Sequence, residues 1–190
     1  MAASKNKALS DDIKKLFPEL DLIKDKKIKQ RTLAVWTDAA VQGGWTAKDL
    51  TKIPFTLLIE TGSISLIDHT RAVTRTAIAI STVLTAEYGD QLPINQDHLI
   101  AGGLLHDVGK CLEYEKKGRK IVKSECGKDL RHPFSGTALA FKRDLPTDIC
   151  HMIAVHAGEG TGHRHTTEAF IIHHADFVNF EPLKNKSQGK

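Results

Sequence analysis

A chain of 190 residues fits a single domain, and its 41% hydrophobic and 26% charged residues are ordinary proportions for a folded protein. No apolar run approaches the ~20 residues of a membrane-spanning helix, and no apolar stretch follows the first lysines, so we expect neither a membrane anchor nor a secretory signal. The three cysteines are widely spaced and form no CxxC pair. This spacing argues against disulfides and a cysteine-based zinc site and predicts a cytoplasmic protein.

The net charge of +4 is mild, but basic residues gather between Lys24 and Arg31 and again between Lys116 and Arg131. These clusters indicate either an ordinary solvated surface or a positive rim that attracts phosphate-bearing substrates. A nucleic-acid-binding face would need a denser basic stripe with aromatic residues, so we do not expect nucleic acid as a partner. The sequence leaves open whether the protein forms a homodimer.

Short helices are expected in the N-terminal part. The first ten residues look disordered, and Asp11 can cap a helix that stops near Pro18. A second helix is expected over residues 26–41, before Gly43-Gly44. Thr46 can then cap a third, with Asp49 at the capping-box position.

The strongest helical pattern covers residues 66–88, where apolar residues recur at three- and four-residue steps before Gly89. A helix over 95–107 should stop at Gly109, and the segment 111–123 around Lys117-Gly118 predicts a small hairpin. Further helices are expected over 133–145, 146–156 and 166–180, and a disordered tail from Lys184. The sequence therefore predicts an all-α fold, a helical bundle with one β-hairpin at its edge.

Six histidines and aspartates occur where these helices begin, end or face their neighbours: His69, His106, Asp107, His132, His156 and Asp176. Imidazole and carboxylate groups together suit first-row divalent metals, and helical bundles assemble such sites from facing side chains. One carboxylate can bridge two metals about 3.5–4 Å apart. The pattern predicts a metal centre. For an isolated histidine such as His98 or His151, a structural role is expected instead.

The order His69, then His106-Asp107, then Asp176 resembles the HD superfamily of metal-dependent phosphohydrolases. The stretch AlaGlyGlyLeuLeuHisAspValGlyLys is similar to the central signature of that family. The resemblance covers roughly residues 67–180, and His132 and His156 resemble the subset that binds two metals. It implies an HD domain over residues 61–183, an N-terminal helical extension over 1–60 packed on this core, and a disordered tail over 184–190.

Two positions depart from the family pattern. Many relatives carry an arginine three residues after the first histidine, whereas this chain has Ala72 there and Arg71 before it. The segment after His156 also has neither the paired histidines nor the GYP motif of the cyclic-di-nucleotide phosphodiesterases. The chain therefore does not resemble that branch.

The resemblance implies His69, His106, Asp107 and Asp176 on one metal, with Asp107 bridging to a second metal on His132 and His156. One or two divalent ions are expected, and Fe, Mn, Mg, Ni and Zn are not distinguished. Metal-activated hydroxide would cleave a phosphate ester or anhydride of a nucleotide or similar small phosphorylated metabolite. Asp107 and Lys110 are the catalytic candidates. Lys110 would contact a phosphoryl oxygen, unless it only forms a surface salt bridge.

The glycine-rich segment 158–165 follows His156 directly. It could close over substrate, with His163 or Arg164 on a phosphate, or be only a flexible connection.

Two other functions share the predicted site. Some HD-fold proteins are di-iron oxygenases that act on a phosphonate or polyol, and they use the same ligand order. A non-catalytic nucleotide-binding signalling module is the second alternative, although such copies usually lack one of the ligands.

Overall fold

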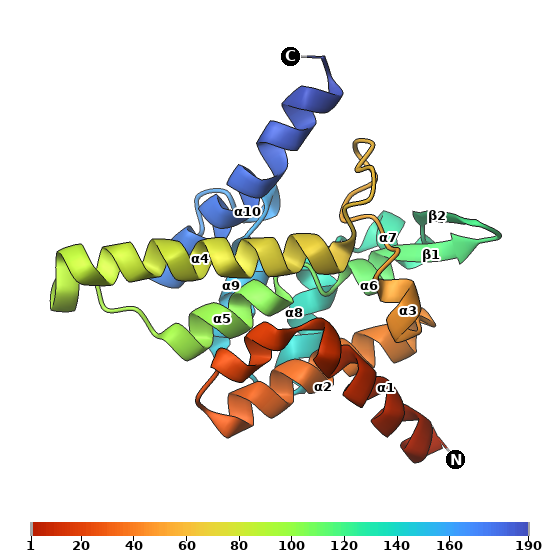
Figure 1. Cartoon of the computed structure of the whole chain (residues 1–190), viewed down its shortest axis with the longest axis horizontal. Helices are drawn as coiled ribbons and strands as arrows, with labels where there is room; N and C mark the ends of the chain where they lie inside the picture. Colours follow the sequence, from red (N-terminus) through yellow and green to blue (C-terminus); the bar gives the residue numbers. More distant parts are fainter. Residues whose placement is uncertain (1, 190) are drawn as a thin grey trace.

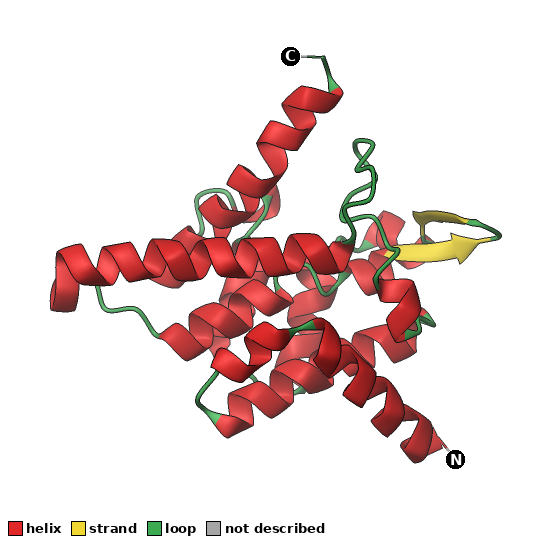
Figure 2. Cartoon of the chain, in the orientation of Figure 1, coloured by secondary structure: helices red, strands yellow, loops and turns green. Residues whose placement is uncertain are grey.

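The computed structural model describes residues 2–189 as a bundle of helices with a two-stranded hairpin at one edge (Figures 1 and 2). The prediction of an all-α fold with a small hairpin is confirmed. The helices are α1 (Ala2–Leu16), α2 (Lys26–Gly43), α3 (Ala47–Leu50), α4 (Leu66–Tyr88), α5 (Gln96–Leu105), α6 (Lys110–Glu113), α7 (Glu125–Asp129), α8 (His132–Lys142), α9 (Thr147–Val155) and α10 (Thr167–Ser187). Across the described residues, the helices are too short or too polar to cross a membrane.

The N-terminal segment differs from expectation, because α1 begins at Ala2 and disorder was wrongly expected over the first ten residues. Leu9, Ile13 and Leu16 recur at three- and four-residue steps, and all three pack against the core. Because this narrow apolar stripe packs against the core, it stabilises the helix in an otherwise lysine-rich segment. α1 contacts α2, and α2 contacts α5, so the N-terminal helices lie against the rest of the bundle.

Local capping signals explain where several helices begin and end. Thr46 and Asp49 form the expected capping box before α3, and Ser65 and Asp68 form another before α4. α4 covers the predicted residues 66–88 and ends at Gly89, whose φ of 52° suits a residue without a Cβ. The capping box of α4 matters for function because it fixes the first turn of that helix, which carries His69.

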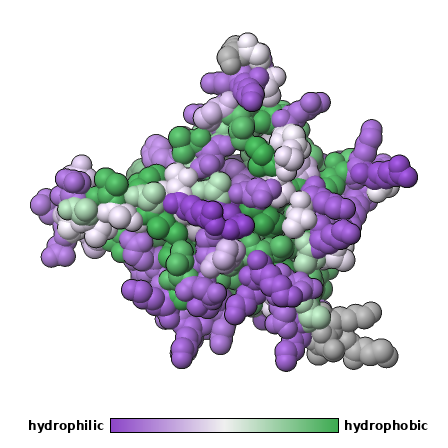
Figure 3. Space-filling view, viewed as in Figure 1, coloured by the Kyte–Doolittle hydropathy of each residue, from purple (hydrophilic) through white to green (hydrophobic). Residues whose placement is uncertain are grey.

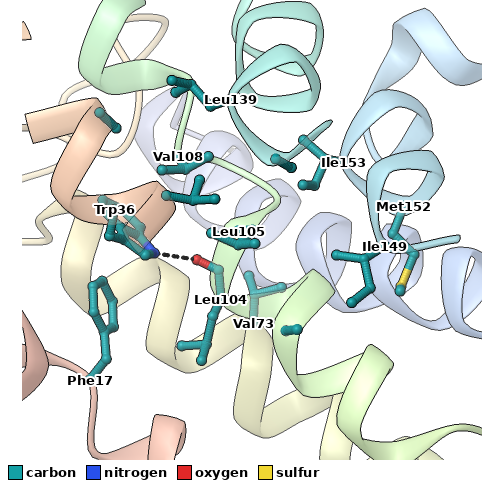
Figure 4. Close-up of a cluster of buried hydrophobic side chains, with 14 of the residues drawn as sticks. Phe17, Trp36, Val73, Leu104, Leu105, Val108, Leu139, Ile149, Met152 and Ile153 are labelled. Atoms are coloured by element: carbon teal, nitrogen blue, oxygen red, sulfur yellow. Dashed lines mark hydrogen bonds between the residues drawn. The ribbon is translucent and has the colours of Figure 1, made fainter. Parts of the chain in front are cut away.

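The short helix α5 lies at the centre of the molecule and contacts α4, α2, α9 and α10. After its polar first turn it is apolar and buried on all sides from Leu99 to Leu105, as expected of a helix surrounded by others. Trp36 of α2 packs 4.7 Å from Phe17, between ring centroids, and its indole nitrogen donates a 2.8 Å hydrogen bond to the carbonyl of Leu104 (Figure 4). The end of α5, which leads into the His-Asp pair, is thereby held in the core.

α5 ends at Leu105, two residues before the predicted end, and Gly109 does not terminate it. Gly109 has an ordinary φ of −62°, and its role is close packing. A Cβ placed on Gly109 would lie 2.1 Å from the carbonyl oxygen of His132 and 2.6 Å from the hydroxyl of Ser135. The missing side chain therefore lets the segment after α5 approach the start of α8.

The predicted hairpin is confirmed as antiparallel strands β1 (Tyr114–Lys117) and β2 (Lys120–Lys123), with Gly118 at φ 64° in the turn. The short helices α6 and α7 on either side of it were not predicted.

α10 continues to Ser187, past the predicted end at Phe180 and into the segment expected to be a disordered tail. Lys184 and Lys186 in its last turn interact favourably with the negative end of the helix dipole. The far end of α10 projects from the bundle and is largely hydrophilic, while hydrophobic residues reach the surface at its base (Figure 3). The division into an N-terminal extension and an HD domain stays a prediction.

Candidate metal centre

The carboxylate of Asp107 lies at the centre of a buried cluster of histidines and is itself only 1% exposed. Its Oδ2 atom is 3.6 Å from Nε2 of His69 and 3.5 Å from Nε2 of His106. Its Oδ1 atom is 3.2 Å from Nε2 of His132 and 3.6 Å from Nε2 of His156. Each oxygen of one carboxylate thus faces its own pair of imidazole nitrogens.

Asp176 of α10 lies beside the first of these two pairs, His69 and His106. Its Oδ1 atom is 3.0 Å from Nε2 of His69 and 4.0 Å from Nε2 of His106. The structure therefore brings all six predicted ligand candidates together, from the first turn of α4, the ends of α5 and α9, the start of α8, and α10.

The donor atoms fit divalent cations. Within the described residues, two groups lie with their ligand atoms inside 4.8 Å of one another, namely His69, His106 and Asp107, and Asp107, His132 and His156. Nε2 of His106 and Oδ1 of Asp107 are buried and have no hydrogen-bond partner among the residues that the structure describes. Buried polar atoms are rarely left unpaired, and bound cations at these two groups would satisfy both atoms.

Hydrogen bonds on the far side of three imidazole rings orient them. Nδ1 of His106 donates to the carbonyl of Gly103 at 2.7 Å, and Nδ1 of His156 donates to the carbonyl of Ile153 at 2.8 Å. Nδ1 of His132 donates to the carboxylate of Glu113 at 2.7 Å. Because Nδ1 of each ring is engaged in this hydrogen bond, Nε2 is the atom left to bind a cation beside Asp107.

Glu113 is a site residue that the sequence reasoning missed. Its Oε2 atom accepts from both the backbone N–H and Nδ1 of His132 at 2.7 Å, and its Oε1 atom is 3.2 Å from Nε of Arg131. Burial would raise the pKa of Glu113, but the hydrogen bonds from His132 and the charge of Arg131 lower it to about 2. If a helical turn had been predicted after the His-Asp motif, Glu113 would have been expected on the same helix face as Lys110, three residues earlier. That spacing could have identified Glu113 as a site residue.

Lys110 is buried, so the alternative of a surface salt bridge is wrong for this residue. Its ammonium group donates to Oδ2 of Asp107 at 2.5 Å and to the carbonyl of Phe55 at 2.6 Å. Burial opposes the charge of Lys110, but the carboxylate of Asp107 outweighs it and raises the pKa. Lys110 therefore stays protonated and partly neutralises Asp107.

A cavity of about 460 Å³ opens onto this cluster. Its polar side includes Lys110, Lys123 and Arg131, together with Tyr114 and Glu159. This volume lies within the ~300–1,000 Å³ typical of small-molecule sites.

His163 and Arg164, the other predicted substrate-binding residues, do not line this cavity. Gly158 and Glu159 at the start of the glycine-rich segment do, but the chain then turns away, and the guanidinium of Arg164 donates to the carbonyl of Ala157 at 2.9 Å. His98 pairs with Asp148, outside the cluster, in keeping with the structural role expected of it.

Comparison with known proteins agrees with this geometry. The sequence model of the HD domain family matches residues 66–179, which is more than half of the chain and includes all six clustered residues. The chain belongs to the HD domain family.

A dihydroneopterin 2',3'-cyclic phosphate phosphodiesterase from Methanocaldococcus jannaschii is 36% identical to this chain over 112 residues. The match covers 58% of this chain and 44% of the relative, so the chain spans less than half of the relative's length. No solved structure matches the chain significantly.

Proposed function

We propose that this protein is a metal-dependent phosphodiesterase that cleaves a small phosphorylated metabolite. The observation that carries the proposal is the arrangement around Asp107, whose two carboxylate oxygens face two separate groups of buried histidines at the floor of a cavity with cationic residues. A shared carboxylate between two cation sites is the arrangement that two-metal hydrolases use.

The proposed ligands are His69, His106, Asp107 and Asp176 for one cation, and Asp107, His132 and His156 for the other. Their histidine-rich donor set suits first-row transition metals such as iron or manganese better than magnesium. When bound, such cations would lower the pKa of a water molecule and offset the charge that develops on a phosphoryl group.

The chain's own residues would hold the phosphodiester at this floor. Arg131 and Lys123 lie at the cavity wall and present positive charge to phosphate oxygens. Lys110, held by the carbonyl of Phe55, keeps the carboxylate of Asp107 in position. The relative that is named as a cyclic phosphate phosphodiesterase supports a cyclic phosphodiester as the substrate. We extend the proposal to a nucleotide-like metabolite in the cytoplasm, where cysteines spaced as Cys111, Cys126 and Cys150 stay reduced.

The test is hydrolysis of cyclic phosphodiesters by the protein reconstituted with iron or manganese, with and without oxygen. We expect a phosphomonoester product in both atmospheres and none after chelation. Hydrolysis that survives full removal of metal, or no hydrolysis with any divalent metal, would contradict the proposal. A requirement for oxygen, with oxygen consumed during turnover, would favour the di-iron oxygenase instead. Binding of nucleotide without turnover would favour the signalling module.

A further inference from the structure

The cavity above Asp107 has a second side that differs in character from its cationic side. Phe177 and Phe180 of α10 line it, together with Leu57 and Leu58 of the loop between α3 and α4. The cationic residues, by contrast, come from α6, β2 and the segment before α8. Figure 1 shows the loop beside α10, and residues 58–64 share a neighbouring cavity with Leu183 and residues 186–188.

The apolar side begins directly at the metal centre. Asp176 and Phe180 are four residues apart on α10, so the side chains share one helix face. The ring of Phe180 is 6.3 Å from that of Phe55, at an interplanar angle of 80°, and Phe55 in turn stacks on His69 at 4.5 Å. A row of aromatic rings therefore leads from a proposed metal ligand to the outer part of the cavity.

These side chains are incompletely covered by the protein. Phe177 and Phe180 are partly exposed, Leu57 is 42% exposed and Leu58 is 79% exposed. A phosphate group gains nothing from apolar walls, whereas a flat ring can stack on aromatic side chains and contact leucine methyl groups. The apolar side of the cavity adjoins the histidine–aspartate cluster. A ring bound there would therefore lie within the length of a small molecule from a phosphate bound at the cluster.

We propose that Phe177 and Phe180, together with Leu57 and Leu58, form a specificity subsite for a flat nitrogen heterocycle carried by the substrate. The subsite rests on the proposed function, since the phosphate of the same molecule is held at the metal centre. In this subsite, Phe177 and Phe180 stack on the ring, and the methyl groups of the loop leucines add apolar contacts to it.

The first test measures equilibrium binding in the metal-loaded protein by calorimetry, with phosphomonoester products as probes because the cyclic substrates would be hydrolysed during the titration. The ring-bearing probes are the 3'-phosphates of adenosine and dihydroneopterin, and the ring-free probe is glycerol 1-phosphate. Stacking on an aromatic side chain changes affinity by roughly 5–150-fold. We expect Phe180→Ala and Phe177→Ala each to weaken binding of at least one ring-bearing probe by about tenfold and to leave the ring-free probe unaffected.

Phe170→Ala is the matched control, because Phe170 lies on the same helix, is 49% exposed and is outside the cavity. It should bind every probe as the unaltered protein does. Equal affinity of the unaltered protein for ring-bearing and ring-free probes would overturn the subsite. Equal weakening of both kinds of probe in the Phe177 and Phe180 variants, or no weakening, would also overturn it.

A second measurement separates failure of the subsite from failure of the proposed function. The substrates are the corresponding cyclic phosphates, namely the 2',3'-cyclic phosphates of adenosine and dihydroneopterin and the ring-free glycerol 1,2-cyclic phosphate. If none is hydrolysed by the metal-loaded protein, the phosphodiesterase assignment fails, while the binding comparison still decides the subsite. If they are hydrolysed, we expect Phe180→Ala to raise KM for the ring-bearing substrates about tenfold and to leave kcat/KM for the ring-free substrate unchanged. Equal effects on both kinds of substrate would leave the phosphodiesterase standing and reject the subsite.

Discussion

Glu113 connects the proposed metal ligand His132 with the cationic side chains of the cavity wall. One carboxylate oxygen accepts two hydrogen bonds from His132, and the other lies 3.2 Å from Arg131 and 4.0 Å from Lys123. Carboxylates that hold the far nitrogen of a metal-binding histidine fix its ring and make it a more basic ligand. Glu113 is therefore a positioning residue for the second cation site.

Glu113→Gln should weaken metal binding at the His132–His156 group by about 10–100-fold, because an amide accepts more weakly and its NH₂ group repels the N–H groups of His132. The group formed by His69, His106 and Asp176 should keep its affinity. Metal titration by calorimetry would show one weakened step and one unchanged step. Glu115→Gln, on the exposed side of β1, is the control. Two unchanged steps in Glu113→Gln would contradict the positioning role.

His132 also makes the stability of the metal-free protein depend on pH. Burial lowers the pKa of His132 to about 4, although its hydrogen bond to Glu113 acts in the opposite direction. Between about pH 6.5 and pH 4 the unfolded chain binds a proton at this residue that the folded chain does not. The free energy of unfolding attributable to His132 therefore decreases as the pH falls through this range.

We expect His132→Asn to lose less of its free energy of unfolding between pH 7 and pH 5 than the unaltered protein, because asparagine does not titrate and its amide can still donate to Glu113. Urea unfolding in the presence of a chelator measures this difference. The same loss in both proteins would show that His132 is not held neutral by burial.

At the scale of elements, the close approach of the chain around Gly109 to the start of α8 brings Asp107 next to His132. Gly109→Ala would place a methyl group against the carbonyl of His132 and the hydroxyl of Ser135. Overpacking of this kind typically costs ~1–3 kcal/mol, so the free energy of unfolding should fall by about that much. The contact between Asp107 and His132 should loosen with it.

Urea unfolding checks the expected loss of stability in Gly109→Ala. Gly158→Ala is the stability control, since a Cβ there meets no other atom within 4 Å. Equal stability of the two variants would mean that the approach of these elements is not tight.

Much of the fold could be predicted because its signals are local. The capping box at Thr46, the three- and four-residue spacing within α4 and the turn at Gly118 each involve neighbours in the chain. The start of α1 was missed because only a narrow apolar stripe of Leu9, Ile13 and Leu16 marks it among many polar residues.

The grouping of the six proposed ligands was likewise predicted, from their places in the helices and from the family resemblance. Lys123 and Arg131 belong to the basic cluster for which a positive rim was one of two interpretations, and both line the cavity. Glu113 was not predicted as a site residue, because its position depends on how α6 and α8 meet in space. His163 and Arg164 were predicted from their closeness to His156 in sequence, but the chain turns away after Glu159. Sequence proximity was a poor guide where an irregular segment changes direction.

At the scale of the whole molecule, the proposed ligands come from α4, α10 and the ends of α5, α8 and α9, so bound cations would tie these elements together. A ligand that binds only the folded state adds ~2.7 kcal/mol of stability when its concentration is 100 times its Kd. For a chain of this size that corresponds to a rise of roughly 5–10 °C in Tm. Removal of each ion by a chelator should therefore lower Tm by about this amount, and added metal should restore it. An unchanged Tm in differential scanning calorimetry would contradict this coupling.

Elemental analysis of the purified protein tests the two-cation centre most directly, with Asp107→Asn as the informative variant. Asparagine keeps the volume of Asp107 but not the charge that both cations would share, and circular dichroism would check that the variant folds. Asp90→Asn, at an exposed position, serves as the control. We predict two divalent ions per chain in the unaltered protein and the control, and loss of most bound metal in Asp107→Asn. A folded Asp107→Asn variant with undiminished metal content would contradict the account.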